Sequence, residues 1–332
     1  MARTLEGGGA AADSAATAGL VPGSKQALEH TRRFIGCYRV TRGKNFRLDD
    51  YEPDHVPDHL SERKAEARAM LAAGVQWLAG LQDKLYAQDR RSLLLVFQAM
   101  DAAGKDGTIK HVMSGVNPQG VQVHSFKQPS AEELDHDYLW RYWKALPERG
   151  RIGIFNRSYY EEVLVVRVHR SILQAQKLPL DCVGKGVFDQ RLRDIAHFED
   201  YLGRNGTRVL KFFLNVSRGE QRRRFIQRLD DPDKRWKFAA ADIRERGHWK
   251  DYMAAYEQAI GATATQAAPW YVVPADNKWL TRLIVVGAVG LALEEMNLAY
   301  PSVDAGRLAE LQQARQALES EAGAGGVRKG RR

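Results

Sequence analysis

The chain has 332 residues, of which 44% are hydrophobic and 27% are charged. This composition is typical of a globular protein with a large buried core, and it excludes a disordered chain, a collagen and a small disulfide-stapled protein. Lys and Arg number 50 against 41 Asp and Glu, and the net charge of +9 favours an anionic partner such as nucleic acid, a membrane surface or a phosphate-rich small molecule.

The sequence predicts neither a membrane span nor secretion. The longest uncharged apolar run near the C-terminus, Leu283 to Leu293, has 11 residues, whereas a spanning helix needs about 20. Residues 1–24 are rich in Gly, Ala, Ser and Thr and resemble a disordered tail more than a signal peptide. Cys37 and Cys182 lie far apart without a metal-ligand spacing. We therefore expect a cytoplasmic protein with reduced thiols.

Helices and strands alternate along the chain after this tail. Residues 25–90 form a helical lead-in, in which 60–86 carry apolar side chains at helical spacing with Ser61 as the expected N-cap. Strands are then predicted at 92–97, 121–125, 151–155, 209–214 and 270–273, and helices at 132–145, 158–166, 188–201, 220–229, 242–260 and 279–298. Such alternation indicates an α/β core over residues 91–300 with a mostly parallel sheet. Residues 301–332 are expected to form a polar helix and a basic tail.

The turn after the first strand carries the most informative motif. Residues 97–108 read Phe-Gln-Ala-Met-Asp-Ala-Ala-Gly-Lys-Asp-Gly-Thr. In a strand-turn-helix unit, backbone N–H groups and the positive end of the helix dipole converge where a phosphate chain can bind, within reach of Lys105. Ala99 and Asp106 depart from the pattern G-x-x-x-x-G-K-[ST], but Asp101 offers a carboxylate that could hold a metal. A turn that binds no ligand is the alternative.

A second polar cluster, residues 154–162, again lies where a strand ends and a helix begins. Open α/β sheets bind ligands at this carboxyl edge, so Arg157 is expected to face the same phosphates as the lysine of the first turn. Asn156 and Glu161 or Glu162 are then placed for metal or nucleotide contacts. The alternative is that Arg157 merely pairs with Glu161 one helical turn later.

A third cluster places five arginines on one predicted helix: Arg218, Arg222, Arg223, Arg224 and Arg228. Like charges four residues apart repel one another unless an anion or a carboxylate neutralises them. Near a phosphate-binding turn, such a helix indicates a lid, here about residues 217–250, that brings an arginine to the transferred group. A solvated basic face is the alternative.

Together these residues resemble the polyphosphate kinase type 2 family, and specifically its class III subgroup, from about Tyr38 to Leu298. The resemblance rests on six blocks in order, at residues 100–110, 116–120, 126–129, 155–162, 228–237 and 268–278. It implies a P-loop kinase fold, a three-layer α/β/α sandwich with a mostly parallel central sheet and a helical lid. In class I members the second motif usually begins with Asp at the position of Asn156 and has Asn-Arg at Glu161-Glu162, and these differences point to class III.

The activity implied by this resemblance is transfer of a phosphoryl group from inorganic polyphosphate to AMP or ADP, giving ADP or ATP. The resemblance also implies dependence on magnesium, with manganese as a substitute, and a homo-oligomer. No membrane or nucleic-acid partner is expected.

The resemblance also implies residue roles. Asp101 would coordinate magnesium, Lys105 would bind the reacting phosphates and Arg157 would stabilise charge on the group in flight. From the lid, Arg224 and Arg228 would clamp the phosphates. Further nucleotide or phosphate contacts are expected from Ala102, Ala103, Gly104, Asp106, Gly107, Thr108, Asn156, Glu161 and Asp242, and a basic groove for the polymer from Lys110, Lys127, Arg167 and Lys237.

Elementary chemistry agrees with this activity. A nucleotide phosphate is already anionic and needs no strong general base, so positioning and charge neutralisation suffice. We expect direct in-line transfer without a covalent enzyme intermediate. Two other functions remain open at this point: an ATP-dependent nucleotide or metabolite kinase with the same loop and lid, and a nucleic-acid-binding module that uses the basic surface.

Overall fold

The protein is built around one six-stranded sheet. The structure, a computed structural model, describes residues 25–325. The tail expected at 1–24 and the last residues of the segment expected at 301–332 therefore lie outside the described residues. The strand order is β1-β6-β5-β2-β4-β3. The strands are β1 (Arg39–Val40), β2 (Ser92–Gln98), β3 (Val121–Ser125), β4 (Ile152–Asn156), β5 (Thr207–Asn215) and β6 (Trp270–Pro274).

The five predicted strands are confirmed, and they pair with one another in parallel. β2 lies between β4 and β5, and all seven of its residues are buried. Burial on both faces explains its continuous apolar run. The sequence did not predict β1, which pairs antiparallel with β6, because two residues show no periodicity.

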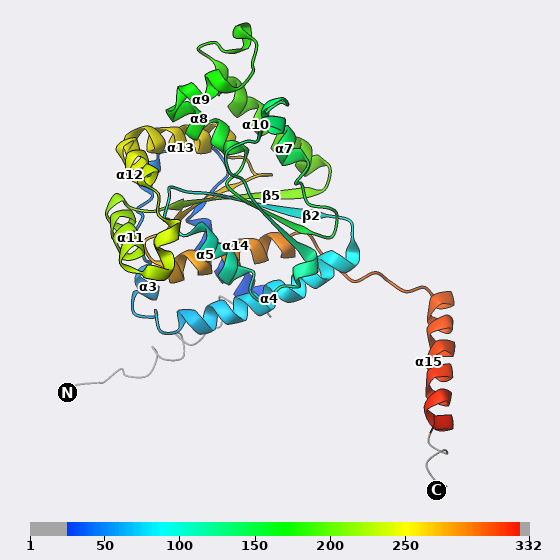
Figure 1. Ribbon diagram of the computed structural model, residues 1–332. Helices are drawn as coiled ribbons and strands as arrows, with labels where there is room; N and C mark the ends of the chain where they lie inside the picture. The colour runs from blue at the N-terminus through cyan, green and yellow to red at the C-terminus, as the bar shows by residue number, and fades with distance from the viewer. Residues whose placement is uncertain (1–24, 326–332) are drawn as a thin grey trace, which may run out of the picture. The chain divides into compact units, whose positions relative to one another are not determined.

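Helices cover both faces of the sheet (Figure 1). One layer contains α14 (Lys278–Glu294), which packs against α2 (Lys25–Gly36), α4 (Ala67–Gln88) and α5 (Lys105–Val112). The other contains α8 (Val165–Val168), α9 (Arg170–Ala175), α10 (Val187–Arg204) and α13 (Trp249–Thr263). The predicted α/β/α architecture is therefore confirmed.

Two of the predicted helices are broken near their ends. The helix expected at 60–86 begins instead as α3 (Asp58–Ser61) followed by α4, so Ser61 ends a short helix and does not cap the long one. The helix expected at 132–145 divides into α6 (Ala131–Leu134) and α7 (Trp140–Trp143). Between these two, the Asp137 carboxylate accepts the Leu139 N–H at 2.9 Å, an Asx-type contact that competes with helix formation.

Two further segments also differ from the prediction. Residues 158–166 form a 3₁₀ turn, η3 (Tyr159–Glu162), before α8. The helix expected at 242–260 divides at Gly247 and His248 into α12 (Ala240–Gly247) and α13. Glycine has a low helix propensity, which favours a break at this point. The remaining 3₁₀ turns are η1 (Leu48–Asp50), η2 (Pro118–Gly120), η4 (Leu180–Cys182) and η5 (Pro232–Lys237).

The expected lid region consists of α11 (Arg218–Asp230), η5 and α12. Beyond it, the chain divides into two compact units, the first ending at Leu298 and the second beginning at Ala299. The second unit contains α15 (Ala305–Gly325), whose described side chains are exposed.

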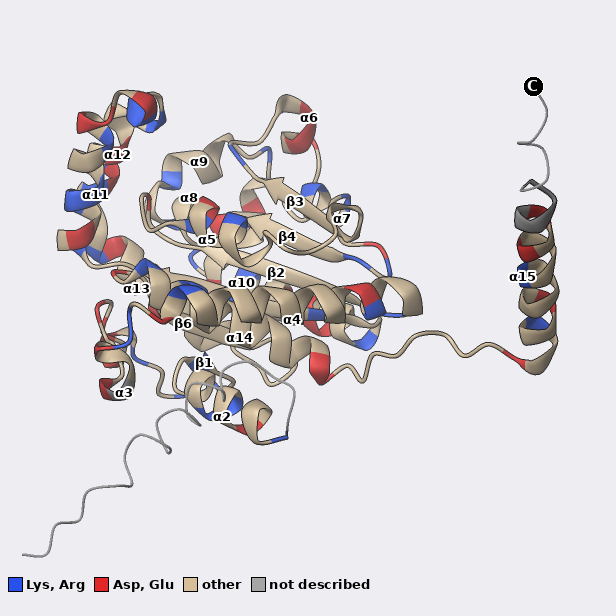
Figure 2. Cartoon of the chain, turned by 90° about the horizontal axis from the view of Figure 1, so that it is seen from below, with Lys and Arg blue, Asp and Glu red and all other residues tan. Residues whose placement is uncertain are grey.

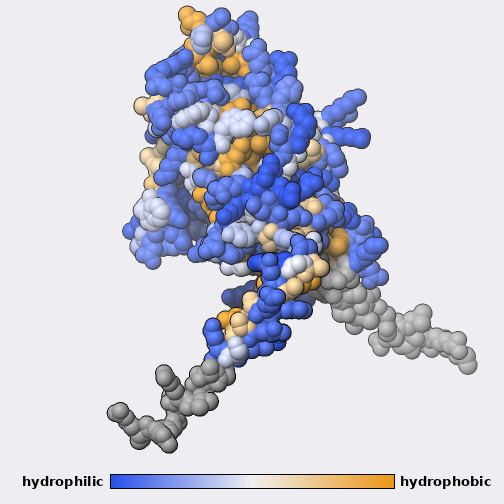
Figure 3. Space-filling view, turned by 90° about the vertical axis from the view of Figure 1, so that its right-hand side faces the viewer, coloured by the Kyte–Doolittle hydropathy of each residue, from blue (hydrophilic) through white to orange (hydrophobic). Residues whose placement is uncertain are grey.

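The described helices include none with the length and apolar character that a membrane crossing demands. The face of the molecule drawn in Figure 3 is mainly hydrophilic, with apolar atoms visible between polar side chains.

Candidate active site

A hollow of about 980 Å³ lies at the carboxyl ends of β3 and β4, beside the turn that follows β2. Residues from this turn, from the lid segment and from the start of α14 line it. Nine of the lining residues are Lys or Arg and three are Asp. Figure 2 marks basic as well as acidic residues along α11 and α12. A hollow with this charge attracts a polyanion.

The predicted phosphate loop, residues 101–104, leads directly into α5. Gly104 is the N-cap of α5 and has φ +109°, and Ala102 has φ +61°. Lys105, the first residue of α5, is buried, and its Nζ donates to the Ala99 carbonyl at 2.8 Å. Burial, followed by the nearby charge of Arg157, lowers the pKa of Lys105 to about 8. The loop thus combines a helix N-terminus with a lysine whose charge is incompletely solvated.

Arg157 connects the second cluster to this loop. Its own backbone is left-handed, with φ +65°, and its N–H donates to the Phe97 carbonyl at 3.0 Å. Its Nη2 donates to Asp101 Oδ1 at 2.8 Å and its Nη1 to Glu161 Oε2 at 3.4 Å. The carboxylates of Glu161 and Asp101 raise the pKa of Arg157, which stays charged. Arg157 therefore lies against the loop and also pairs with Glu161, and its contact with phosphates stays a prediction.

The other polar residues of the second cluster point in different directions. Asn156 Nδ2 donates to Asp106 Oδ1 at 2.7 Å at the rim of the hollow. Glu161 accepts from Gln98 Nε2 at 2.9 Å and is not among the residues that line the hollow. Glu162 lies away from it, in a buried ion pair with Arg191 at 2.9 Å.

In the lid, Arg228 and Asp242 lie within 3.9 Å of each other and both line the hollow. Arg228 Nη1 also donates to the Lys237 carbonyl at 3.2 Å. Burial, with a contribution from the charge of Asp101, raises the pKa of Asp242. The hollow thus has one carboxylate from the loop and one from the lid, close enough to influence each other.

These two carboxylates suit magnesium. Within residues 25–325, no group of three or more His, Cys, Asp or Glu side chains could hold a metal ion. Magnesium, however, is commonly bound by one or two carboxylates together with substrate phosphates, and keeps several waters. The loop and lid aspartates fit that mode of binding.

The structure gives Arg224 different partners from those expected. We expected it to clamp phosphates beside Arg228, but its side chain is buried against the protein, with an exposed fraction of 5%. Its donors point at the Glu220 carboxylate and at four backbone carbonyl oxygens. Arg224 and Arg228 are one turn apart on α11 and both line the hollow, but Arg224 is buried and Arg228 is partly exposed.

The four lysines and arginines expected in a polymer groove divide into two pairs. Lys127 and Lys237 are exposed and line the hollow. Lys110 lies five residues along α5 from Lys105 and does not line it. Arg167 lies over the Phe188 ring, 5.5 Å from its centroid, and is likewise not a lining residue.

Sequence reasoning missed several residues of the site. Lys234, Lys278 and Arg282 line the hollow, and Gln221 contacts the loop from α11. Lys278 ends the last of the six sequence blocks, which was a signal that went unused. Nothing in the sequence distinguished Gln221 from any other polar helix residue.

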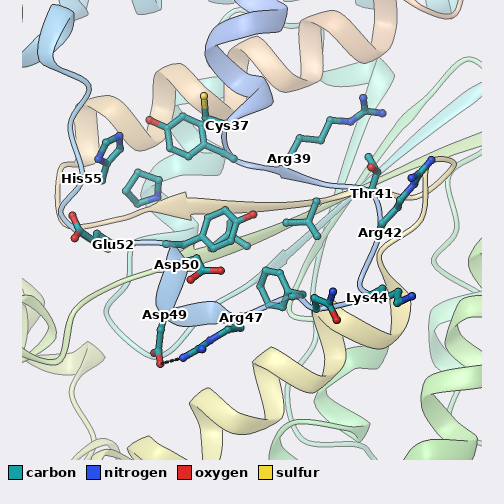
Figure 4. A pocket seen from close by; sticks show the side chains of 17 residues that line it. Cys37, Arg39, Thr41, Arg42, Lys44, Arg47, Asp49, Asp50, Glu52 and His55 are labelled. Atoms are coloured by element: carbon teal, nitrogen blue, oxygen red, sulfur yellow. Dashed lines mark ion pairs between the residues drawn. The ribbon is translucent and has the colours of Figure 1, made fainter.

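A second hollow, of about 770 Å³, lies beside β1 and η1 (Figure 4). Its described lining contains none of the predicted site residues. It contains both basic and acidic side chains, and Arg47 and Asp49 lie 3.9 Å apart. This mixture of charge distinguishes it from the strongly basic hollow at the loop.

Comparison with known proteins agrees with the geometry. The family model described as polyphosphate kinase 2 matches residues 61–301. An ADP-polyphosphate phosphotransferase of Rhodopseudomonas palustris is 54% identical over 250 residues, which cover 75% of this chain and 86% of that protein. An AMP/ADP-polyphosphate phosphotransferase of Meiothermus ruber is 44% identical over 264 residues, 80% of this chain and 94% of that protein.

A solved structure is similar as well. The crystal structure of polyphosphate kinase 2 from Arthrobacter aurescens aligns with a TM-score of 0.76 at 41% identity, and the alignment covers 84% of this chain and 95% of that one. The family model matches well over half of the chain, and the similar structure has the same layered fold. The chain therefore belongs to the polyphosphate kinase 2 family.

Proposed function

We infer that this chain is a polyphosphate-dependent phosphotransferase that phosphorylates ADP and AMP. The observation that carries this conclusion is one basic hollow lined by both the phosphate loop and the lid, with Lys105 on one side and Arg228 on the other. The relatives that cover most of this chain are named for transfer between polyphosphate and these nucleotides. Such a hollow holds two phosphate chains that must approach each other.

We assign the steps of the reaction to charge and position. Lys105 and the N-terminus of α5 bind the donor phosphates, and Arg157 neutralises charge on the transferred group. Arg228 approaches from the lid, while Asp242 holds it in place through their ion pair. Because the acceptor phosphate is an anion, its oxygen attacks directly, and the phosphoryl group moves in line without a covalent intermediate.

Magnesium belongs to this proposal. Asp101 from the loop and Asp242 from the lid would hold it together with substrate oxygens, and manganese would replace it. When bound, the ion would supply positive charge that offsets the charge developing on the phosphates. Asp101 has a second task, since its carboxylate orients Arg157.

Both AMP and ADP are proposed as acceptors. Asn156 and the Glu161-Glu162 pair match the class III pattern, whereas the relative with 54% identity is named for ADP alone. Initial rates with AMP and with ADP, at saturating polyphosphate, test this point. An enzyme that uses ADP but leaves AMP untouched contradicts the class III assignment.

Donor identity tests the function itself. The enzyme is incubated with AMP, magnesium and either long-chain polyphosphate or ATP, and new ADP is measured against consumed donor. We expect polyphosphate to support turnover. Turnover with ATP alone would support instead a nucleotide or metabolite kinase that uses the same loop and lid.

Three further experiments test the remaining parts. A nucleic-acid-binding module would keep its salt-dependent binding of DNA or RNA after Lys105→Ala, whereas our proposal expects no specific binding in either protein. A phosphorylated side chain after a single turnover would overturn direct transfer.

The expected homo-oligomer is tested by light scattering. A cytoplasmic location accords with Cys37 and Cys182, which are both free and exposed.

A further inference from the structure

The buried face of α11 lies directly behind the phosphate loop. Gln221 and Arg224, nearly one helical turn apart, are 1% and 6% exposed. Gln221 Nε2 donates to the Asp101 carbonyl at 2.8 Å. Arg224 Nη1 donates to the carbonyls of Ala102 at 3.1 Å and Ala103 at 2.6 Å. Two side chains thus hold three successive carbonyl oxygens of the loop.

The rest of the Arg224 guanidinium is anchored elsewhere in the core. Its Nη2 donates to the carbonyls of Ala275 at 2.5 Å and Asp276 at 3.2 Å, just beyond β6. Its Nε donates to Glu220 Oε1 at 2.7 Å. A guanidinium has five N–H groups, and these contacts supply five acceptors within the described residues. Arg224 is therefore fully engaged with protein oxygens.

These contacts determine which way the loop presents its N–H groups. In a planar trans peptide the C=O and the N–H point in opposite directions. The Ala103 carbonyl points at Arg224, so the Gly104 N–H of the same peptide points away from it. The carbonyl oxygens of the loop are thereby paired with side-chain donors of α11.

The loop also needs support from outside itself. Ala102 has φ +61° and Gly104 has φ +109°, both in the left-handed region, and left-handed backbone is strained for alanine. Such strain persists only where the surroundings over-determine the conformation. Arg224 and Gln221 provide this constraint from one rigid helix, while Arg224 ties the same loop to the end of β6.

We propose that Arg224, assisted by Gln221, is a positioning residue that fixes the peptide orientation of the phosphate loop and does not itself bind phosphate. The proposal rests on the proposed function in one respect, that this loop binds the donor phosphates. It assigns different roles to Arg224 and Arg228, which lie one turn apart on α11. Arg228 acts on substrate, and Arg224 orients the loop.

The test uses Arg224→Lys and Arg224→Gln in the full-length enzyme, with Arg223→Gln as the matched control. Arg223 pairs with the same Glu220, but it is exposed and does not contact the loop. Amide hydrogen exchange is measured on the ligand-free proteins, and binding of tripolyphosphate with magnesium is measured by calorimetry. Exchange requires no substrate, so it reports on the loop independently of the reaction.

We expect both Arg224 variants to speed exchange at Ala103 and Thr108 at least tenfold, since these amides donate to carbonyls of Met100 and Gly104 at the loop. Exchange in β2 should stay as in wild type. Tripolyphosphate affinity should fall at least tenfold in both variants, because lysine keeps the charge but lacks the guanidinium fork. The control should match wild type in every measurement.

The opposite results overturn the proposal. The first is unchanged amide exchange at the loop, and the second is faster exchange throughout the core. The third is a tripolyphosphate affinity that stays near wild type in Arg224→Lys and falls only in Arg224→Gln. If the Arg224 variants do not fold, Gln221→Met removes one of the three loop contacts and should raise exchange at Ala103 to a smaller extent; wild-type exchange then contradicts the idea. Failure of the wild-type enzyme to use polyphosphate overturns the function and leaves the exchange result standing.

Discussion

The Asp101 carboxylate and the Arg157 guanidinium meet at 2.8 Å although 56 residues separate them in the chain. The contact joins the ends of β2 and β4, which are adjacent in the sheet. It places the metal-binding carboxylate proposed for this site against the cation proposed for the transferred group. Each of these residues thus depends on the other for its orientation.

Asp101→Asn should therefore reduce turnover sharply without unfolding the protein. The variant keeps the side-chain volume but loses the charge that we propose binds magnesium and that pairs with Arg157. We expect kcat to fall by about 10² to 10³ or more, the size seen when one electrostatic contact to a transition state is removed. The pair is partly exposed, so thermal unfolding should change little. Wild-type kcat in this variant contradicts the loop assignment.

The lowered pKa of Lys105 predicts that kcat/KM for polyphosphate falls at alkaline pH. Burial, followed by the charge of Arg157, lowers its pKa to about 8, so the ammonium predominates below this pH and is lost above it. Since the charged form binds phosphate, kcat/KM for polyphosphate should fall as the pH rises through about 8 in the free enzyme.

The control for this prediction is Lys105→Arg. A guanidinium stays protonated, so whatever activity this variant keeps should show no alkaline limb near pH 8. Measurements at constant free magnesium separate the lysine from metal effects. An identical limb in both proteins means that a different group titrates.

The fold was largely predictable from the sequence because its signals are local. A continuous apolar run such as 92–97 followed by a turn and a helix predicts a buried parallel strand. The alternation of strand and helix patterns located the other four strands of the prediction. The breaks in the helices were not predicted. They depend on single side chains, such as the Asp137 carboxylate that accepts the Leu139 N–H.

The candidate site was predictable in its residue types but not in the direction of each side chain. The spacing of Arg224 and Arg228 places them on one helix face, and both were expected to reach the phosphates. Both residues line the hollow, but packing of α11 against the loop buries Arg224 and gives its guanidinium protein partners that the sequence did not predict. The burial of Glu162 with Arg191 has the same origin, because tertiary contacts and not periodicity select its partner.

Arg228→Ala should lower kcat by about 10³ or more, with a smaller effect on the KM for the nucleotide. The reason is that a lid arginine acts mainly on charge that develops during transfer. Arg222→Ala is the matched control, since Arg222 lies on the same helix, is exposed and does not line the hollow. Steady-state kinetics of Arg228→Ala and Arg222→Ala measure kcat and the KM for the nucleotide in each. Equal losses in the two variants indicate a general effect of helix charge and contradict a specific role.

The buried pair of Lys211 and Glu199 predicts a large effect on stability. Lys211 Nζ donates to Glu199 Oε2 at 2.5 Å, and their side chains are 0% and 2% exposed. Burial lowers the pKa of Lys211 and raises that of Glu199, so each depends on the other to stay charged. Tyr159 and Tyr160 also donate to this carboxylate.

Lys211→Met leaves that carboxylate buried without its cation and should reduce the free energy of unfolding by about 3–5 kcal/mol. The double variant Lys211→Met with Glu199→Gln removes both charges, while the amide oxygen still accepts from the tyrosines, and should regain most of this loss. Urea denaturation of the single and double variants measures the difference. If uncompensated charge is the cause, the double variant is the more stable of the two. An equal loss of unfolding free energy in the single and double variants would assign the effect to packing instead.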